Sequence, residues 1–160
     1  HGAALAAYGV LQHDLLAQDD PRPLLGLAPG QVLYKLAGAA VAPAWRGQGL
    51  QRQLIARRVA WAGDAALFAT AAPGNVPSWR SLLACGFAVR ALQYRYGGHA
   101  RYLLARVPGA ALAHGAPARE LAQDDIPGQE ALLAQGWQGI APGQAPGSLR
   151  LVAPAGGGQP

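Results

Sequence analysis

A glycine-punctuated turn follows an apolar stretch and leads directly into an amphipathic helical pattern. The apolar stretch runs from Gln31 to Val41, the turn is Arg46-Gly47-Gln48-Gly49, and the helical pattern is LQRQLIARRVAWA. The first backbone amides of a helix lack intrahelical acceptors and lie at the positive end of the helix dipole, so they attract anions. Glycines let the backbone approach a phosphate closely, and Arg46 and Arg52 can add charge-assisted hydrogen bonds. The pattern is that of a phosphate-binding turn, but taken alone it favours an ordinary strand-to-helix turn whose glycines serve only the backbone geometry.

This turn resembles the acyl-CoA signature of the GCN5-related N-acetyltransferases, the GNAT superfamily, which reads Gln/Arg-x-x-Gly-x-Gly/Ala. Within VAPAWRGQGLQRQLI, Arg46 and Gly49 match the signature, whereas Gln51 departs from it at the last small-residue position. The turn is not a nucleotide P-loop, because no Gly-Lys-Ser/Thr follows and the spacing is too short. It also differs from the Gly-x-Gly-x-x-Gly of dinucleotide folds.

Two further segments support the resemblance. Asn75 and Ser78, followed by Gly86-Phe87, have the spacing that the family typically shows after its next strand. The segment Tyr96-Gly97-Gly98-x-x-Arg101-Tyr102 is similar to the last hairpin of one branch of the superfamily. Together the three segments extend the resemblance over roughly residues 33–107.

The resemblance implies transfer of an acetyl group from acetyl-CoA, as co-substrate, to a primary amine of a small molecule or peptide. Backbone groups at the end of the 31–41 stretch would bind the pantetheine arm, and the amides of the glycine turn would bind the pyrophosphate. The residues that it places at the cofactor are Ala39, Val41, Arg46, Gly47, Gln48, Gly49, Leu50, Gln51, Asn75 and Ser78. No His/Cys/Asp/Glu group has metal-ligand spacing, so we expect no metal.

The catalytic acid and base are not evident from the family pattern. Many members have a tyrosine seven residues after the asparagine, where this chain has Leu82, and a glutamate on the strand before the glycine turn, which LYKLAGAAV lacks. The first candidates to replace them are Tyr96 and Asp14, and the second candidates are Tyr102 and His13. The favoured interpretations of these residues are nevertheless packing tyrosines and a solvated strand end. Cys85, in the apolar LLACGF, is interpreted as a core residue.

Because the family's tyrosine and glutamate are missing, a second function stays open: a non-catalytic acyl-CoA-binding sensor or regulatory domain. The net charge is +5, which favours anionic partners. A nucleic-acid-binding face built from Arg57-Arg58, Arg90, Arg95 and Arg101 is a weaker alternative, because no aromatic platform or recognition helix accompanies these arginines. We interpret them as solvated surface and expect no nucleic-acid partner, while a homodimer stays open.

The length of 160 residues indicates one compact fold, and no apolar run is long enough to cross a membrane. The single cysteine fits a reducing compartment, so we expect a cytoplasmic protein without membrane contact. The expected order is strand, strand, helix, strand, helix, strand, strand, which is a mixed, mostly antiparallel α+β sheet flanked by helices. The expected strands are 3–12, 31–41, 66–71, 87–96 and 100–107, and the expected helices are 50–62 and 76–85.

The chain is divided at Pro108, where its composition changes. Residues 1–108 are assigned to the GNAT-like domain, in which we expect the first strand and helices of the family fold to be absent. Residues 109–160 are assigned to a linker, a helix at about 124–136, a strand at 148–153 and a flexible end. The apolar pattern of this tail predicts that it packs on the domain or on a second subunit, near the missing region. No internal repeat is evident.

Overall fold

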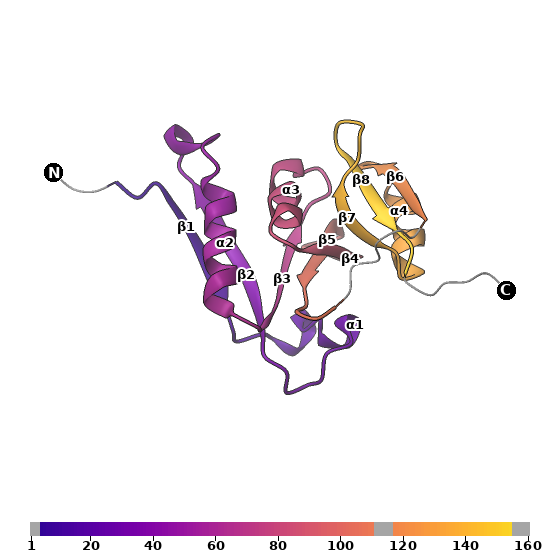
Figure 1. Ribbon diagram of the computed structural model, residues 1–160, viewed down its shortest axis with the longest axis horizontal. Helices are drawn as coiled ribbons and strands as arrows, with labels where there is room; N and C mark the ends of the chain where they lie inside the picture. The colour runs from indigo at the N-terminus through magenta and orange to yellow at the C-terminus, as the bar shows by residue number, and fades with distance from the viewer. Residues whose placement is uncertain (1–3, 111–116, 155–160) are drawn as a thin grey trace.

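The structure, a computed structural model, describes residues 4–110 and 117–154, which form one eight-stranded sheet with helices packed against it (Figure 1). The strand order is β1-β2-β3-β5-β4-β7-β8-β6, and among these pairs β2·β3 is parallel and the others are antiparallel. The predicted mixed, mostly antiparallel α+β sheet is therefore confirmed. The strands are β1 (Ala7–Gln12), β2 (Leu33–Val41), β3 (Ala66–Ala71), β4 (Ala88–Arg95), β5 (His99–Arg106), β6 (Ala118–Ala122), β7 (Gln138–Pro142) and β8 (Ser148–Val152).

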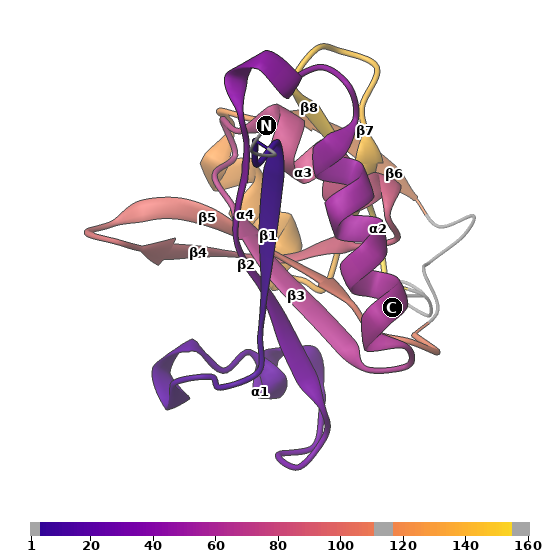
Figure 2. The same cartoon turned by 90° about the vertical axis from the view of Figure 1, so that its left-hand side faces the viewer.

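The main helices begin and end close to the predicted positions. They are α2 (Leu50–Ala62), α3 (Val76–Ala84) and α4 (Ile126–Ala134). The connection between β1 and β2, predicted as a loop, contains a 3-10 helix at Ala17–Asp19 and the short α1 (Arg22–Leu25), both at the lower end of the molecule in Figure 2. Strands β6 and β7 were not predicted, because neither has an alternating apolar pattern that would reveal it.

Two buried clusters lie on opposite sides of the sheet. The larger one joins side chains of α2, α3 and α4, including Ile55, Trp79 and Leu132, to the strands. The smaller one packs Leu25 of the β1–β2 connection against strand residues such as Phe68 and Leu103. Successive strand side chains point to opposite faces, so Tyr102 and Leu104 of β5 join the first cluster while Leu103 joins the second.

One predicted surface arginine is buried. Arg58 is 9% exposed, and its guanidinium donates to the carbonyls of Val10 (3.0 Å) and Leu54 (3.1 Å). A Cβ at Gly9 would come within 2.9 Å of the Arg58 Cζ, so a side chain there would displace the guanidinium from its present place. Burial lowers the pKa of Arg58. The assignment of Arg57-Arg58 to solvated surface is thus wrong for Arg58, which holds β1 where its register against β2 shifts.

The sequence contains an internal repeat with an offset of 50 residues, contrary to the expectation of none. The first copy of the segment is NVPSWRSLLACGF, residues 75–87, and the second is DIPGQEALLAQGW, residues 125–137. Both begin with an N-cap residue whose side chain accepts from the backbone amide three positions later, Asn75 from Ser78 and Asp125 from Gly128. Both end at a glycine with φ 84°, Gly86 and Gly136.

The repeat extends over four elements in each copy. We call β3-α3-β4-β5 the first unit and β6-α4-β7-β8 the second unit. In each, the last strand pairs between the other two, and the register shifts at the same place, between Val89 and Ala91 in the first and between Gly139 and Ala141 in the second. The units meet where Val89 pairs antiparallel with Gly139, its own equivalent. They are therefore related by an approximate two-fold axis, with α3 packing on β7 and α4 packing on β4.

This arrangement places the C-terminal segment in the sheet. The predicted helix and strand of the tail are present as α4 and β8, and the tail packs on the domain beside β4. That position is not near the start of the chain, because β1 lies at the other end of the strand order. Most of the predicted linker, residues 111–116, and most of the predicted flexible end, residues 155–160, lie outside the described residues.

Candidate functional site

The site lies where β2 and β3 separate. The two strands pair in parallel at Leu33–Ala66, Tyr34–Leu67 and Lys35–Phe68, and no pairing continues beyond Lys35. From there β2 continues alongside β1 to Val41, while β3 continues alongside β5 to Ala71. The edge of β2 that contains Ala39 and Val41 therefore has no strand on its β3 side in the described structure. This edge belongs to the end of the 31–41 stretch, where the resemblance implies binding of the pantetheine arm.

The glycine turn has the backbone geometry that only glycine adopts readily. Gly47 has φ 76° and Gly49 has φ 74°, both in the left-handed region. A Cβ at either position would meet no other atom within 4 Å, so the space in front of the turn is open. Gly49 is the N-cap of α2, and no side chain of the described residues caps this helix, whereas Asn75 caps α3 and Asp125 caps α4. The first-turn amides of α2 thus have no side-chain acceptor, as an anion site requires.

The N-termini of α2 and α3 converge at this opening. Nε2 of Gln51, in the first turn of α2, donates to Oγ of Ser78, in the first turn of α3, at 3.4 Å. Further along, the Cys85 thiol lies 3.8 Å from the carbonyl of Arg52, which links the same two helices. Two cofactor residues predicted from motifs 27 positions apart are therefore brought into contact by the fold. Gln51, the departure from the family signature, occupies the contact between the two helices.

The remaining predicted cofactor residues surround this contact. Arg46 donates from Nε to the carbonyl of Val41 at 3.3 Å, so its side chain folds back onto the end of β2. Gln48 is exposed in the turn and Leu50 is half-buried at the start of α2. The Asn75 Oδ1 accepts from the Ser78 amide at 3.3 Å, which uses one face of the side chain for capping. All of the predicted residues except Asn75 and Ser78 lie on β2, the turn or the start of α2.

The structure separates the candidate catalytic residues. Asp14 pairs with His13 at 2.8 Å and is solvent-exposed, beyond the end of β1 that lies opposite Lys35. The glycine turn follows the other end, where Ala7 pairs with Val41. Tyr96 is 64% exposed in the β4–β5 turn, has φ 54°, and lies under the guanidinium of Arg101 at 5.4 Å. These two candidates therefore do not share one site with the glycine turn through any described contact.

The two other positions are buried in the core. Tyr102 is fully buried and donates its hydroxyl to Oε1 of Gln129 at 2.5 Å. Burial raises its pKa to about 12. Leu82, which stands at the position of the family tyrosine, is 4% exposed in the larger cluster. Cys85 is half-buried, and burial raises the pKa of its thiol, as expected for a packing residue.

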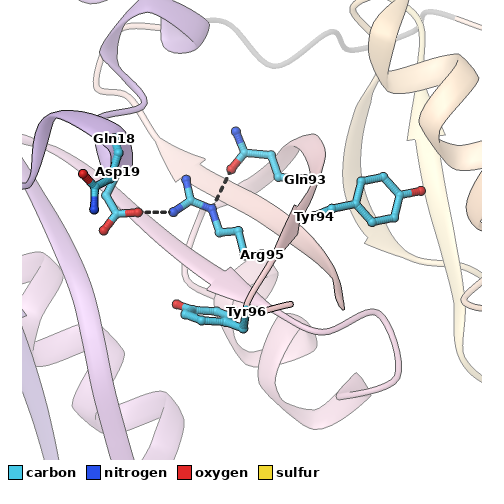
Figure 3. A pocket seen from close by; sticks show the side chains of 6 residues that line it. All are labelled: Gln18, Asp19, Gln93, Tyr94, Arg95 and Tyr96. Atoms are coloured by element: carbon cyan, nitrogen blue, oxygen red, sulfur yellow. Dashed lines mark hydrogen bonds and ion pairs between the residues drawn. The ribbon is translucent and has the colours of Figure 1, made fainter. Parts of the chain in front are cut away.

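An open cavity of about 760 Å³ was not predicted from the sequence (Figure 3). It lies between the β1–β2 connection and the β4–β5 hairpin, and Asp19 and Arg95 form an ion pair across it. These two residues are 76 positions apart, and the sequence carries no local signal that pairs them. Its lining consists of Gln18, Asp19, Gln93, Tyr94, Arg95 and Tyr96.

Among the described residues, no helix is long and apolar enough to cross a membrane. In the same part of the chain, no three His, Cys, Asp or Glu side chains are grouped as they would be around a metal ion.

Comparison with known proteins identifies the fold. Residues 10–87 match the model of the Acetyltransferase (GNAT) family. The structure of Arabidopsis thaliana NAA60 in complex with acetyl-CoA aligns with a TM-score of 0.51 and 16% identity over 64% of this chain and 66% of that chain. The histone acetyltransferase HPA2 and related acetyltransferase from Corynebacterium glutamicum aligns with a TM-score of 0.49 and 19% identity, covering 68% and 60%. No curated protein matches the chain in sequence.

The resemblance that the glycine turn first indicated is therefore confirmed, and the fold is that of the GNAT acetyltransferases. The chain spans slightly less than two thirds of the length of the solved structures that it matches.

Proposed function

We propose that this domain binds acetyl-CoA at the glycine turn and transfers the acetyl group to a primary amine. The observation that carries the proposal is the convergence of two helix N-termini, joined by Gln51 and Ser78, on the opening between β2 and β3. The uncapped first turn of α2 and the open space at Gly47 and Gly49 suit a pyrophosphate. The free edge of β2 at Ala39 and Val41 suits the amide-containing pantetheine arm. NAA60, which has the same fold, was crystallised with acetyl-CoA.

The reaction is a direct acyl transfer. The amine nitrogen attacks the thioester carbonyl carbon, the carbon–sulfur bond breaks, and the thiolate of CoA takes up a proton as the amine loses one. The chain contributes to this step by holding both reactants together, and a backbone amide of β2 can polarise the carbonyl. This chain lacks the tyrosine and the glutamate of the family pattern, so both proton transfers would pass through water.

The test compares two substitutions of the same size at Gly49. Asp and Asn both tolerate the left-handed backbone better than other residues and both cap helices well, so Gly49→Asp and Gly49→Asn should fold alike. Only aspartate places a negative charge where the pyrophosphate would lie. We expect calorimetric titration with acetyl-CoA to show micromolar binding to the parent chain, and Gly49→Asp to bind at least about tenfold more weakly than Gly49→Asn.

Titration with dephospho-CoA, which lacks the ribose 3′-phosphate of CoA and keeps the pyrophosphate, is the control for that phosphate. If the turn binds the pyrophosphate, the difference between the two Gly49 variants should persist with this ligand. Equal binding by the Asp and Asn variants would show that the turn does not contact the pyrophosphate. Absence of acetyl-CoA binding in the folded parent chain would remove the proposed function.

One observation favours a non-catalytic acyl-CoA sensor as the second candidate. Leu82 stands where many family members have the tyrosine that acts as general acid, and it is part of the packed core. That position therefore supplies no proton to the leaving thiolate. A sensor would bind acetyl-CoA without turning it over. Release of free CoA thiol in the presence of an amine, measured over the spontaneous rate and abolished in Gly49→Asp, would exclude the sensor.

A further inference from the structure

The cavity beside the β4–β5 hairpin is placed to receive the amine. Gln93 and Arg95 of β4 alternate with Leu92, which joins the cluster on the α2 and α3 side, so they point to the opposite face. Gln18 and Asp19 come from the β1–β2 connection, whose leucines pack on that same opposite face. The hairpin extends past Ala71, the end of β3, because Ala71 pairs with Tyr102 and β5 begins earlier, at His99. The cavity therefore lies beyond the Ala71 end of β3, on the face of the sheet away from α2 and α3.

Each carboxylate at or near this cavity already has a partner. Asp19 is the one carboxylate that lines it, and it pairs with Arg95. The neighbouring Asp20 pairs with Arg22 at 2.6 Å. On the far side of β4, Glu130 accepts from the hydroxyl of Tyr94 at 3.3 Å, and Figure 3 shows the Tyr94 ring pointing away from the Asp19–Arg95 pair. All eight acidic residues of the sequence lie in the described ranges, so no masked segment can add an acidic side chain to the cavity.

Arginine remains available to a ligand at the same place. Arg95 donates from Nε to Gln93 at 3.1 Å and from Nη1 to Asp19, and its Nη2 has no partner among the described residues. Arg101 adds a second positive charge over the ring of Tyr96. Its Nε is buried without a hydrogen-bond partner in the described structure. A guanidinium binds carboxylates strongly and in a fixed geometry.

From these contacts we infer that the acceptor is a monoamine that also carries a carboxylate, as an amino acid or an acidic peptide does. This inference rests on the proposed function and names the class of its amine substrate. Arg95, supported by Arg101, binds the carboxylate, and the two glutamines bind amide or hydroxyl groups of the substrate. Amines with several positive charges, such as polyamines and aminoglycosides, bind poorly, because a second ammonium group would face arginines without a free carboxylate.

Three five-carbon amines test the inference. The acceptor 5-aminovalerate carries a carboxylate at the far end, pentylamine carries a methyl group, and cadaverine carries a second ammonium group. Acetyl transfer is followed by release of the CoA thiol, and equilibrium binding of each amine is measured calorimetrically in the presence of CoA. We expect 5-aminovalerate to exceed pentylamine by about tenfold in kcat/KM and in affinity, as a charged hydrogen bond allows, with cadaverine below both.

Arg95→Gln removes the charge that the inference invokes, and Arg150→Gln removes one from the exposed face of β8 as a matched control. We expect the first variant to bring 5-aminovalerate and pentylamine to similar values, and the second to leave the preference intact. Because Arg95→Gln unpairs Asp19, the double variant Asp19→Asn/Arg95→Gln is measured as well, with melting temperatures to confirm folding. The double variant should also lack the preference for the carboxylate.

The outcomes separate the inference from the proposed function. Turnover or binding that is greatest for cadaverine, or equal for all three amines, overturns the inference while the acetyl transfer stands. Acetyl-CoA binding without turnover of any amine overturns the enzymatic function, and the binding measurements still decide whether the cavity prefers the carboxylate. A preference that survives Arg95→Gln also overturns the inference, because it would arise elsewhere.

Discussion

The two repeat units of this protein have the same architecture and different surroundings. In each, a capped helix packs over a three-strand arrangement with the same register shift, and each helix ends at a glycine of φ 84°. The first unit lies next to β2, the glycine turn and α2, so Asn75 and Ser78 lie at the candidate cofactor site. The second unit lies at the edge of the described sheet, where β6 has no further strand beside it.

This difference shows that the unit itself does not make the site. The second unit retains the cap, the apolar helix face and the terminal glycine, yet β6 is the edge strand of the described sheet, so no counterpart of β2 and α2 lies beyond it. Its contribution is structural, because it pairs with β4 at Val89 and adds Leu132, Leu133, Leu149 and Leu151 to the larger cluster. A carboxylate at position 125 would also repel an anion that asparagine at position 75 tolerates.

The largest expected effect follows from the central side chain of each helix. Trp79 in the first unit and Gln129 in the second are equivalent positions and both are 0% exposed. Trp79 donates to the carbonyl of Pro73 at 2.9 Å and contacts Tyr102 edge-on. We expect Trp79→Ala to lower the free energy of unfolding by about 3–5 kcal/mol, measured by urea denaturation. Trp61→Ala, at a 71% exposed tryptophan, is the control and should change it by less than about 1 kcal/mol.

Loss of the buried glutamine should have a smaller effect. Gln129 donates to the carbonyl of Ala122 at 2.5 Å and accepts from Tyr102, so Gln129→Leu leaves the buried Tyr102 hydroxyl without its partner. The Ala122 carbonyl is exposed and still accepts from the Asp125 amide at 3.1 Å, so the unpaired Tyr102 hydroxyl accounts for an expected loss of about 1–3 kcal/mol. The double variant Tyr102→Phe/Gln129→Leu should be less destabilised than the sum of the two single variants, because both members of the pair are removed. Strict additivity would show that the pair is not coupled.

The same pair predicts a pH dependence. Burial raises the pKa of Tyr102 to about 12, above the value of about 10 for an exposed tyrosine. The folded state therefore retains its proton more strongly, and the stability that this adds is fully present below about pH 10 and is lost as pH rises through about 12. In the parent chain the free energy of unfolding should fall over this range more than in Tyr102→Phe. Equal slopes would contradict the burial of this hydroxyl.

Exchange of the two caps sharpens the comparison further. Asn75→Asp gives the first unit the cap of the second, and Asp125→Asn does the reverse. Both residues are good N-caps, so each exchange should change the melting temperature little, whereas Asn75→Ala and Asp125→Ala should each cost about 1 kcal/mol. We expect Asn75→Asp alone to weaken acetyl-CoA binding, by about tenfold. Equal effects of the two exchanges on binding would place both caps at the same distance from the ligand.

The smallest expected effect concerns the C-cap positions, Cys85 in the first unit and Gln135 in the second. Burial raises the pKa of Cys85, so its thiolate fraction at pH 8 is lower than that of a free thiol and a disulfide reagent should modify it slowly. Position 135 is exposed. In the variant Cys85→Ala/Gln135→Cys we expect the thiol to react at nearly the free rate. Equal rates at the two positions would contradict the burial of Cys85 between α2 and α3.

Much of the fold was predictable because its signals are local. The helical periodicity from Leu50 to Ala62 and the turn glycines indicated α2, and Asn75 with Gly86 indicated both ends of α3. Arg58 was misassigned because its periodic position shows only that it lies off the apolar face. Its burial depends on the missing side chain of Gly9, a residue of a different element. The repeat was missed because its strands differ in sequence while its helices share only a few positions.

The sequence by itself determined the glycine turn, the capped helices and the family that these motifs indicate, since each depends on residues within a few positions of one another. Only the tertiary structure decided that Gln51 meets Ser78, that Asp19 meets Arg95, and that the second unit lies beside β4. Such contacts join segments far apart in the chain. They depend on strand pairing and twist, which no local spacing of residue types encodes.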